Sequence, residues 1–316
     1  MYNLSPLELK QNSTMVKTNR RNFTRMISMA GLSAAVMRVP ELKAGKVEQA
    51  ASDSGLKISL NAYSFNSLLA SGKMTIDDML DFCVETGIEG LDITGYYFPG
   101  YPAVPPDDYI FRIKKKAFRL GIDLGCTGVR SDFTWADPAK RAEEKKLVKE
   151  WIVVAQKLGA PGVRIFAGAL SGENYPWEER AKWIADDIRE CAEFGKNHGV
   201  MLALQNHWDF IKTSEQADKM IKLINHDWVG LMLDTGNYRS FDPYKEIEDT
   251  AKYAISWMIK EMVYINEKPE NADIDRIVGI VRKSGYRGYL PIETLGQGDP
   301  FEKVRVMYGK IKKALG

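Results

Sequence analysis

The segment Met201–Phe210, MLALQNHWDF, changes abruptly from apolar to polar residues. Its first four residues are apolar, which is typical of a buried strand. Gln205, Asn206 and His207 follow directly. In parallel α/β proteins, the polar groups that bind ligands stand at the carboxyl ends of buried strands. We therefore expect other strands of this chain to end in the same way.

Eight strand-like segments of this kind alternate with helix-like segments from Leu56 onward. The predicted strands are 56–65, 88–98, 122–129, 160–168, 200–207, 229–237, 255–263 and 288–295. Helical spacing and end signals predict helices within 75–87, 138–159, 176–199, 213–225 and 271–285. Such alternation indicates a parallel sheet with right-handed crossovers. Eight units over roughly 260 residues predict an α/β fold, a (β/α)8 TIM barrel.

An open doubly wound sheet is the alternative fold. Such sheets typically bind nucleotides through a glycine-rich loop, and the sequence contains neither GxGxxG nor GxxxxGK[ST]. The barrel is therefore the preferred architecture.

The N-terminal residues resemble a Tat-type export signal. Thr18–Arg25, TNRRNFTR, contains twin arginines and precedes the uncharged run Met26–Met37, MISMAGLSAAVM. This run is too short for a stable membrane span. We expect residues 1–55 to be a Tat-like signal segment with a polar tether and residues 56–316 to be a single barrel. The expected location is the periplasm, or the cytoplasm if the segment is only a flexible basic arm.

The composition excludes some classes of protein. The chain is 45% hydrophobic and 27% charged, an ordinary balance for a soluble globular protein. Residues 1–56 hold eight Lys/Arg and four Asp/Glu, a net charge of +4, so the rest of the chain has a net charge of −2. This nearly neutral body is a poor match for nucleic acid. The odd number of cysteines (Cys83, Cys126 and Cys191) does not indicate a disulfide framework, and we expect all three to be buried.

The carboxyl ends of the predicted strands select the candidate site residues. Of the three histidines, only His207 ends a strand, whereas His198 and His226 precede strands and belong to the opposite end of a barrel. The same criterion selects Asn61, Tyr63, Asp92, Tyr96, Arg130, Arg164, Gln205, Asn206, Asp234, Asn237, Lys260, Glu261 and Glu293.

Asp234 and Glu293 are the strongest candidates because each follows a largely apolar run. A carboxylate at the end of a buried strand is costly unless it is paired, hydrogen-bonded or bound to a metal. A salt bridge to Lys260 is the structural alternative to a functional role. Lys260 itself interrupts an apolar segment and is either a counter-ion or a catalytic group.

The strand endings LALQNH, LMLDTGN and LPIETLG together resemble those of the xylose isomerase-like TIM barrels. This family includes sugar isomerases, 3-epimerases and apurinic endonucleases, and the resemblance covers residues 56–316. Metal-dependent epimerases of the family bind a divalent ion through Glu, Asp, His and Glu. The corresponding residues here are Gln205, Asp234, Met258 and Glu293. The resemblance thus implies a weakened divalent-metal site at Gln205, Asp234 and Glu293, with Mn or Mg favoured and Zn also open, because Gln is uncharged and a thioether binds hard ions poorly.

The resemblance also implies chemistry on a small-molecule carbohydrate. We expect an isomerase, epimerase or lyase that removes a proton next to a carbonyl group. Glu293 would be the base, and His207 or Lys260 would supply the returning proton. Residues expected to bind the substrate are Tyr63, Tyr96, Asn206, Trp208 and Asn237.

Gln205 bears on the choice among these reactions. Without a carboxylate at this position, one-base isomerisation or elimination is favoured over a symmetric two-base 3-epimerisation. An apurinic endonuclease is disfavoured because a multi-zinc site needs more histidines than the three present. The alternative function is a catalytically silent carbohydrate-binding barrel. The sequence makes no prediction about the oligomeric state.

Overall fold

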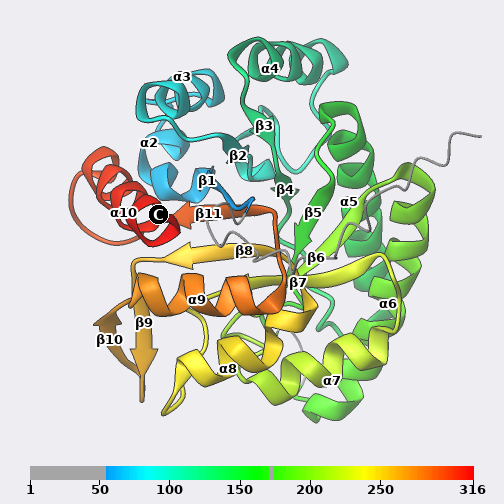
Figure 1. The fold of residues 1–316 in the computed structure, drawn as a ribbon. Helices are drawn as coiled ribbons and strands as arrows, with labels where there is room; N and C mark the ends of the chain where they lie inside the picture. Colours follow the sequence, from blue (N-terminus) through cyan, green and yellow to red (C-terminus); the bar gives the residue numbers. More distant parts are fainter. Residues whose placement is uncertain (1–54, 171–173) are drawn as a thin grey trace, which may run out of the picture. The chain divides into compact units, whose positions relative to one another are not determined.

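Parallel strands form the centre of the molecule in a computed structural model, which describes residues 55–170 and 174–316 (Figure 1). The strands are β1 (Lys57–Asn61), β2 (Gly90–Asp92), β3 (Asp123–Leu124), β4 (Cys126–Gly128), β5 (Gly162–Ile165), β6 (Met201–Gln205), β7 (Val229–Asp234), β8 (Ala254–Lys260) and β11 (Tyr289–Glu293). They are ordered β3-β2-β1-β11-β8-β7-β6-β5-β4. Only Gly125 separates β3 from β4, so the two ends of this order belong to one interrupted strand. The barrel is therefore nearly closed, and the predicted (β/α)8 architecture is confirmed.

The interruption at Gly125 is filled by the side chain of Asp92. The Cys126 N–H donates to Asp92 Oδ1 at 3.2 Å. A Cβ atom at position 125 would overlap Asp92 Oδ1, so only glycine leaves room for this carboxyl group. The third strand of the barrel thus accommodates a polar side chain from the second.

One helix follows each of the eight barrel strands, counting β3 and β4 as one. These helices are α3 (Ile76–Thr86), α4 (Asp107–Leu120), α5 (Pro138–Leu158), α6 (Trp177–His198), α7 (Ser214–Ile224), α8 (Pro243–Thr250), α9 (Ile274–Ser284) and α10 (Pro300–Leu315). A short helix, α2 (Asn66–Ala70), precedes α3. Figure 1 shows the long helices around the outside of the strands.

The five predicted helices are confirmed, with their end signals. The Thr75 side chain caps α3 in a capping box with Asp78, and Gly87 ends this helix in the left-handed conformation. Helices α4, α8 and α10 were not among the predicted segments.

The strands are shorter than predicted at their carboxyl ends. β2 ends at Asp92, and Gly95–Tyr97 form a 3-10 helix instead. The predicted strand 255–263 is two strands that meet at Glu261. The second, β9 (Met262–Ile265), pairs with β10 (Lys268–Asn271) in an antiparallel hairpin beside the barrel (Figure 1). Residues after each strand are therefore free to turn onto the rim of the barrel.

The remaining sequence predictions about location have mixed outcomes. His198 is the last residue of α6, and His226, which precedes β7, contacts Glu193 of α6. Both histidines therefore lie at the end of the barrel opposite the carboxyl ends of the strands, as predicted. Cys83 and Cys191 are buried, but Cys126 is partly exposed, so the expectation of three buried cysteines was wrong for Cys126. In the described ranges, no helix is long and apolar enough to cross a membrane. The predicted signal segment lies outside the described residues except for Gly55, and export stays a prediction.

The Gly125 contact predicts opposite effects of two Gly→Ala substitutions. Gly125→Ala should lower the free energy of unfolding by about 1–3 kcal/mol, because the new methyl group overpacks against Asp92. Gly279→Ala, inside α9, should raise it by about 0.5–1 kcal/mol, because its new methyl group would meet no atom within 4 Å. Urea unfolding measures both values. Equal effects of the two substitutions would contradict the close approach at Gly125.

Candidate active site

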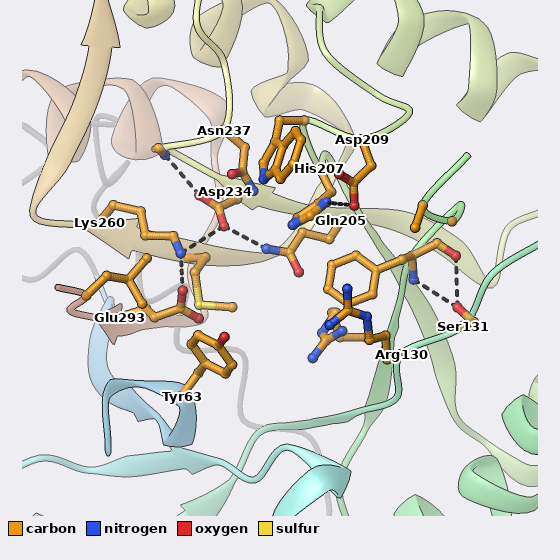
Figure 2. A pocket seen from close by; sticks show the side chains of 18 of the residues that line it. Tyr63, Arg130, Ser131, Gln205, His207, Asp209, Asp234, Asn237, Lys260 and Glu293 are labelled. Carbon is orange, nitrogen blue, oxygen red and sulfur yellow. Dashed lines mark hydrogen bonds and ion pairs between the residues drawn. The ribbon is translucent and has the colours of Figure 1, made fainter. Parts of the chain in front are cut away.

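A pocket of about 960 Å³ lies at the carboxyl ends of the barrel strands (Figure 2). It brings together most of the residues predicted from the strand endings. Those that line it are Tyr63, Tyr96, Arg130, Arg164, Gln205, His207, Asp234, Asn237, Lys260, Glu261 and Glu293. Trp208, predicted separately to bind the substrate, lines it as well. The criterion of strand endings, applied to the predicted barrel, therefore located one shared cavity from the sequence.

A buried cation between two carboxylates stands at one side of this pocket. Lys260 Nζ lies 3.3 Å from Asp234 Oδ2 and donates to Glu293 Oε1 (Figure 2). Lys260, Asp234 and Glu293 are 8%, 0% and 6% exposed. The strand register causes this contact, because Lys260 on β8 is the direct neighbour of Glu293 on β11. Lys260 is thus a counter-ion for both carboxylates, and its position in the pocket leaves a catalytic role open as well.

The charges in this cluster stabilise one another. Burial alone lowers the pKa of Lys260, but Asp234 and Glu293 outweigh it and raise the pKa above the ordinary lysine value. Burial raises the pKa of Asp234 to about 6, although Lys260 acts in the opposite direction. At neutral pH, the ammonium is therefore protonated and Asp234 is predominantly ionised.

Neutral donors hold the Asp234 carboxylate in place. Gln205 Nε2 donates to Asp234 Oδ2 at 2.6 Å, and the Gly236 N–H donates to Oδ1 at 2.9 Å. The Asn206 side chain bonds to both the N–H and the carbonyl of Asp234, and Asn206 is fully buried and does not line the pocket. Asn206, predicted to bind substrate, instead fixes the end of β7.

The residues predicted to bind a divalent ion do not form a suitable donor set. Gln205, Asp234 and Glu293 do meet, but the Lys260 ammonium contacts both carboxylates, and Gln205 directs its amide N–H at Asp234 rather than its oxygen. Met258, at the place of the fourth ligand, offers only a thioether. In the part of the chain that the structure describes, no group of three or more His, Cys, Asp or Glu side chains is arranged to hold a metal. This donor set therefore does not fit a divalent ion.

His207 forms a pair with a residue that the strand-ending criterion missed. Its Nδ1 lies 2.8 Å from Asp209 Oδ2, and its ring packs against Phe166 with the centroids 4.8 Å apart. Burial lowers the pKa of His207, and Asp209 partly offsets this effect. The imidazole is therefore neutral at neutral pH, and the neighbouring carboxylate favours the proton on Nδ1. This leaves Nε2 as a proton acceptor; Figure 2 shows the ring at the edge of the pocket. The spacing His-x-Asp in HWDF was the available signal for Asp209.

Two other candidates, Asn61 and Asp92, belong to the barrel framework. Neither lines the pocket. Asn61 accepts a hydrogen bond from the Tyr63 N–H and caps the turn after β1. Burial raises the pKa of Asp92 to about 7, and its Oδ2 is buried with no hydrogen-bond partner in the described residues. A neutral carboxyl group is less costly in this position than a carboxylate.

Comparisons with known proteins agree with this architecture. The model of the family described as xylose isomerase-like TIM barrel matches residues 80–307. No curated protein matches the sequence. Similar solved structures include the 3-keto-D-glucoside 4-epimerase from E. coli, which is 13% identical with a TM-score of 0.65 and covers 82% of this chain and 99% of its own.

Two further structures are similar over the same share of the chain. The IOLI protein, solved with a bound zinc atom, is 17% identical with a TM-score of 0.66 and covers 82% of this chain and 96% of its own. D-psicose 3-epimerase from Clostridium cellulolyticum H10, solved with D-tagatose, is 18% identical with a TM-score of 0.63 and covers 82% and 94%. Identities this low show a shared fold and not a shared activity.

The donor set predicts a protein without a resident divalent ion. Full-length protein purified without chelator should contain well under one Mn, Mg or Zn per chain by plasma mass spectrometry, because the ammonium already balances Asp234 and Glu293. The triple variant Q205E/M258H/K260M, which supplies two further ligands and removes the competing cation, should gain metal. A stoichiometric ion in the unmodified protein that is lost in Asp234→Ala would contradict this assignment.

Asp92 predicts a specific dependence of stability on pH. Its pKa is about 7 in the folded protein and about 3.9 in an unfolded chain. Between these values the folded state holds a proton that the unfolded state has lost, so this group's contribution to stability falls as pH rises from about 4 to about 7. The total effect is on the order of 4 kcal/mol. In urea unfolding, Asp92→Asn should therefore gain stability relative to the unmodified protein between pH 5 and pH 8. If the unfolding free energies of the two proteins changed with pH in the same way, Asp92 would not be the group responsible.

Proposed function

The chain belongs to the xylose isomerase-like TIM barrel family, and on this basis we propose that it is an enzyme that isomerises a carbohydrate by removing a proton next to a carbonyl group. One observation carries the proposal. A buried ammonium, a carboxylate and a neutral imidazole border the same pocket at the carboxyl ends of the strands. These are the three kinds of group that enolisation of a sugar requires.

Lys260 is the group that stabilises negative charge. When a proton leaves the carbon next to a carbonyl, the electron pair of the C–H bond moves to the carbonyl oxygen. A protonated amine that is already fixed in place by two carboxylates needs no reorganisation to bind that oxygen. Asp234, which faces Lys260 and does not itself need to react, is a positioning residue.

Glu293 is the base that removes the proton from carbon. Its Oε1 accepts from Lys260, whereas no hydrogen bond involves its Oε2 within the described ranges. The free oxygen is next to the cation that would hold the enolate, so base and electrophile approach adjacent atoms of the substrate. Glu293 can then return the proton to the neighbouring carbon.

His207 transfers the hydroxyl proton that isomerisation also moves. In the enediol, the former alcohol oxygen must lose its proton while the former carbonyl oxygen gains one. A neutral imidazole with Nδ1 against Asp209 can accept a proton at Nε2 and give it back. The net reaction moves one hydrogen from carbon to the adjacent carbon and one from the hydroxyl oxygen to the former carbonyl oxygen, and it consumes no other reactant. Elimination on a keto-glycoside is the alternative that uses the same first step.

Aromatic side chains supply surfaces for the sugar rings. Trp208 and Tyr63 are 49% and 37% exposed although both line the pocket, and Tyr96 lines it as well. The Asn237 amide donates to the Asn206 carbonyl, which orients the rest of its side chain at the rim. We propose that the aromatic rings pack against the apolar faces of the carbohydrate.

Hydrogen exchange tests the proposed first step without knowledge of the product. Ketoses and keto-glycosides incubated with the protein in D₂O should gain deuterium next to the carbonyl, as followed by NMR. Glu293→Gln should reduce this exchange by about 10²–10⁴-fold, because it removes the base. Sugar binding should persist, because the substitution keeps the shape of the side chain.

Glu248→Gln is the matched control, since Glu248 is an exposed carboxylate that pairs with Lys283 outside the pocket. Its exchange rate should be unchanged. A sugar that binds tightly but shows no exchange would favour the alternative, a catalytically silent carbohydrate-binding barrel. Exchange that survives in Glu293→Gln would remove Glu293 from the role of base.

A further inference from the structure

Two arginines that line the pocket, Arg130 and Arg164, have no carboxylate partner among the described residues. Lys260 pairs with Asp234 and Glu293, and Arg239 lies 3.3 Å from Glu267. In contrast, the described residues contain no carboxylate within ion-pair distance, 4.0 Å, of Arg130 or Arg164. These two positive charges are not used by the chemistry proposed above.

Arg164 is held in a fixed orientation by neutral groups. It is 6% exposed, and its Nη1 donates to the Val129 carbonyl at 2.9 Å and to the Tyr96 hydroxyl at 3.0 Å. Its guanidinium carbon lies 4.1 Å from the centroid of the Phe166 ring. A cation this buried is costly without a counter-charge, and neutral hydrogen bonds compensate only part of the cost.

The other nitrogens of Arg164 remain available to a ligand. No hydrogen bond from Nε or Nη2 to a described residue is present, and neither atom is among the fully buried atoms that lack a partner. They therefore border accessible space, and the side chain lines the pocket. A guanidinium with free nitrogens along one edge can donate two parallel hydrogen bonds to a carboxylate or a phosphate.

Arg130 lies on the same wall as Arg164. It follows Val129, the residue whose carbonyl accepts from Arg164, and Arg164 on β5 pairs with Gly128 on β4. The Arg130 N–H donates to the Tyr101 hydroxyl at 3.1 Å, which fixes its backbone. Figure 2 shows its side chain reaching into the pocket, across from Lys260 and Glu293.

Two acidic residues on the same side of the pocket, Asp132 and Glu144, accept hydrogen bonds from nearby backbone N–H groups. Asp132 Oδ1 accepts from the Thr134 N–H at 3.0 Å, and Glu144 Oε2 accepts from the Asp132 N–H at 3.1 Å. Burial raises the pKa of Glu144, which reduces the negative charge it brings. Neither carboxylate pairs with Arg130 or Arg164.

We propose that Arg130 and Arg164 form an anion subsite and that the substrate is therefore an acidic carbohydrate, which carries a carboxylate or a phosphate group. The proposal rests on the proposed function only for the carbohydrate. The anion binds at the arginine wall, and the carbonyl end of the same molecule then faces Lys260 and Glu293 on the opposite side. Because the two arginines lie across the pocket from Lys260, an anion bound to them stays away from the carboxylates of Asp234 and Glu293.

Binding of matched sugar pairs tests the subsite without any turnover. Calorimetry with the full-length chain would compare D-fructose with D-fructose 6-phosphate and D-glucose with D-glucuronate. We expect the anionic member of at least one pair to bind ten-fold or more tightly than its neutral partner, and the preference to weaken as salt is raised. A preference in the first pair identifies phosphate, and a preference in the second identifies carboxylate.

Variants assign the preference to the two arginines. The Arg130 side chain is exposed, so its replacement should not disturb folding. Arg130→Gln should weaken binding of the anionic sugar five-fold or more and leave the affinity for the neutral sugar unchanged. Arg164→Lys keeps the charge but loses the paired donors, and it should also reduce the preference. Arg239→Gln, the third arginine that lines the pocket, is the matched control and should keep the preference, because its charge already faces Glu267.

Equal affinity within both pairs, including no measurable binding of any member, would overturn the subsite. So would a preference that survives in both Arg130→Gln and Arg164→Lys. These outcomes are distinct from failure of the proposed function. Deuterium exchange on neutral sugars without any preference for the anionic sugars would support the proposed enzyme function and contradict the anion subsite. Tighter binding of the anionic sugars without deuterium exchange would support the subsite and contradict the proposed enzyme function.

Discussion

The contact of Lys260 with Asp234 and Glu293 is the interaction on which the rest of the site depends. Two carboxylates at the ends of buried strands are tolerable because an ammonium from the strand between them lies against both. This also accounts for Gln205. A third carboxylate at this position would add an uncompensated buried charge, whereas the amide donates to Asp234 and leaves the cluster with one net negative charge. Gln205 and Lys260 are therefore coupled features of one electrostatic arrangement.

The pocket has two walls with different arrangements of charge. The wall formed by β7, β8 and β11 carries the paired charges. The wall formed by β4 and β5 carries Arg164, which neutral groups hold in place, and Arg130. His207 stands just after β6 between them, with Asp209 supporting its ring. Zinc in the similar IOLI structure shows that this barrel architecture is compatible with a metal centre. In this chain the Lys260 ammonium lies against Asp234 and Glu293, so likeness of fold does not by itself transfer a cofactor.

The sequence predicted the architecture and the contents of the pocket better than the roles of individual residues. A polar residue directly after an apolar run marks the carboxyl end of a parallel strand, and a barrel gathers all such ends at one rim. This is why Tyr63, His207 and Glu293, far apart in the sequence, share one cavity. Asp92 and Asn206 satisfied the same criterion but serve the framework, because their side chains bond to neighbouring strands. The sequence pattern of one strand does not show which groups on the neighbouring strands its side chains will contact.

The sequence by itself determined the order of the eight barrel strands and of five of the helices between them, the helix ends at residues such as Thr75 and Gly87, and the polar residues at the strand ends. These properties follow from local periodicity and capping, which act over a few residues. Only the tertiary structure decided which charges pair. Lys260 meets Glu293 through the register of β8 with β11. The described groups that contact Arg164 are the Val129 carbonyl, the Tyr96 hydroxyl and the Phe166 ring, and none of them is a carboxylate. Pairing of charges depends on distances of a few ångströms between distant segments, and folding alone sets those distances.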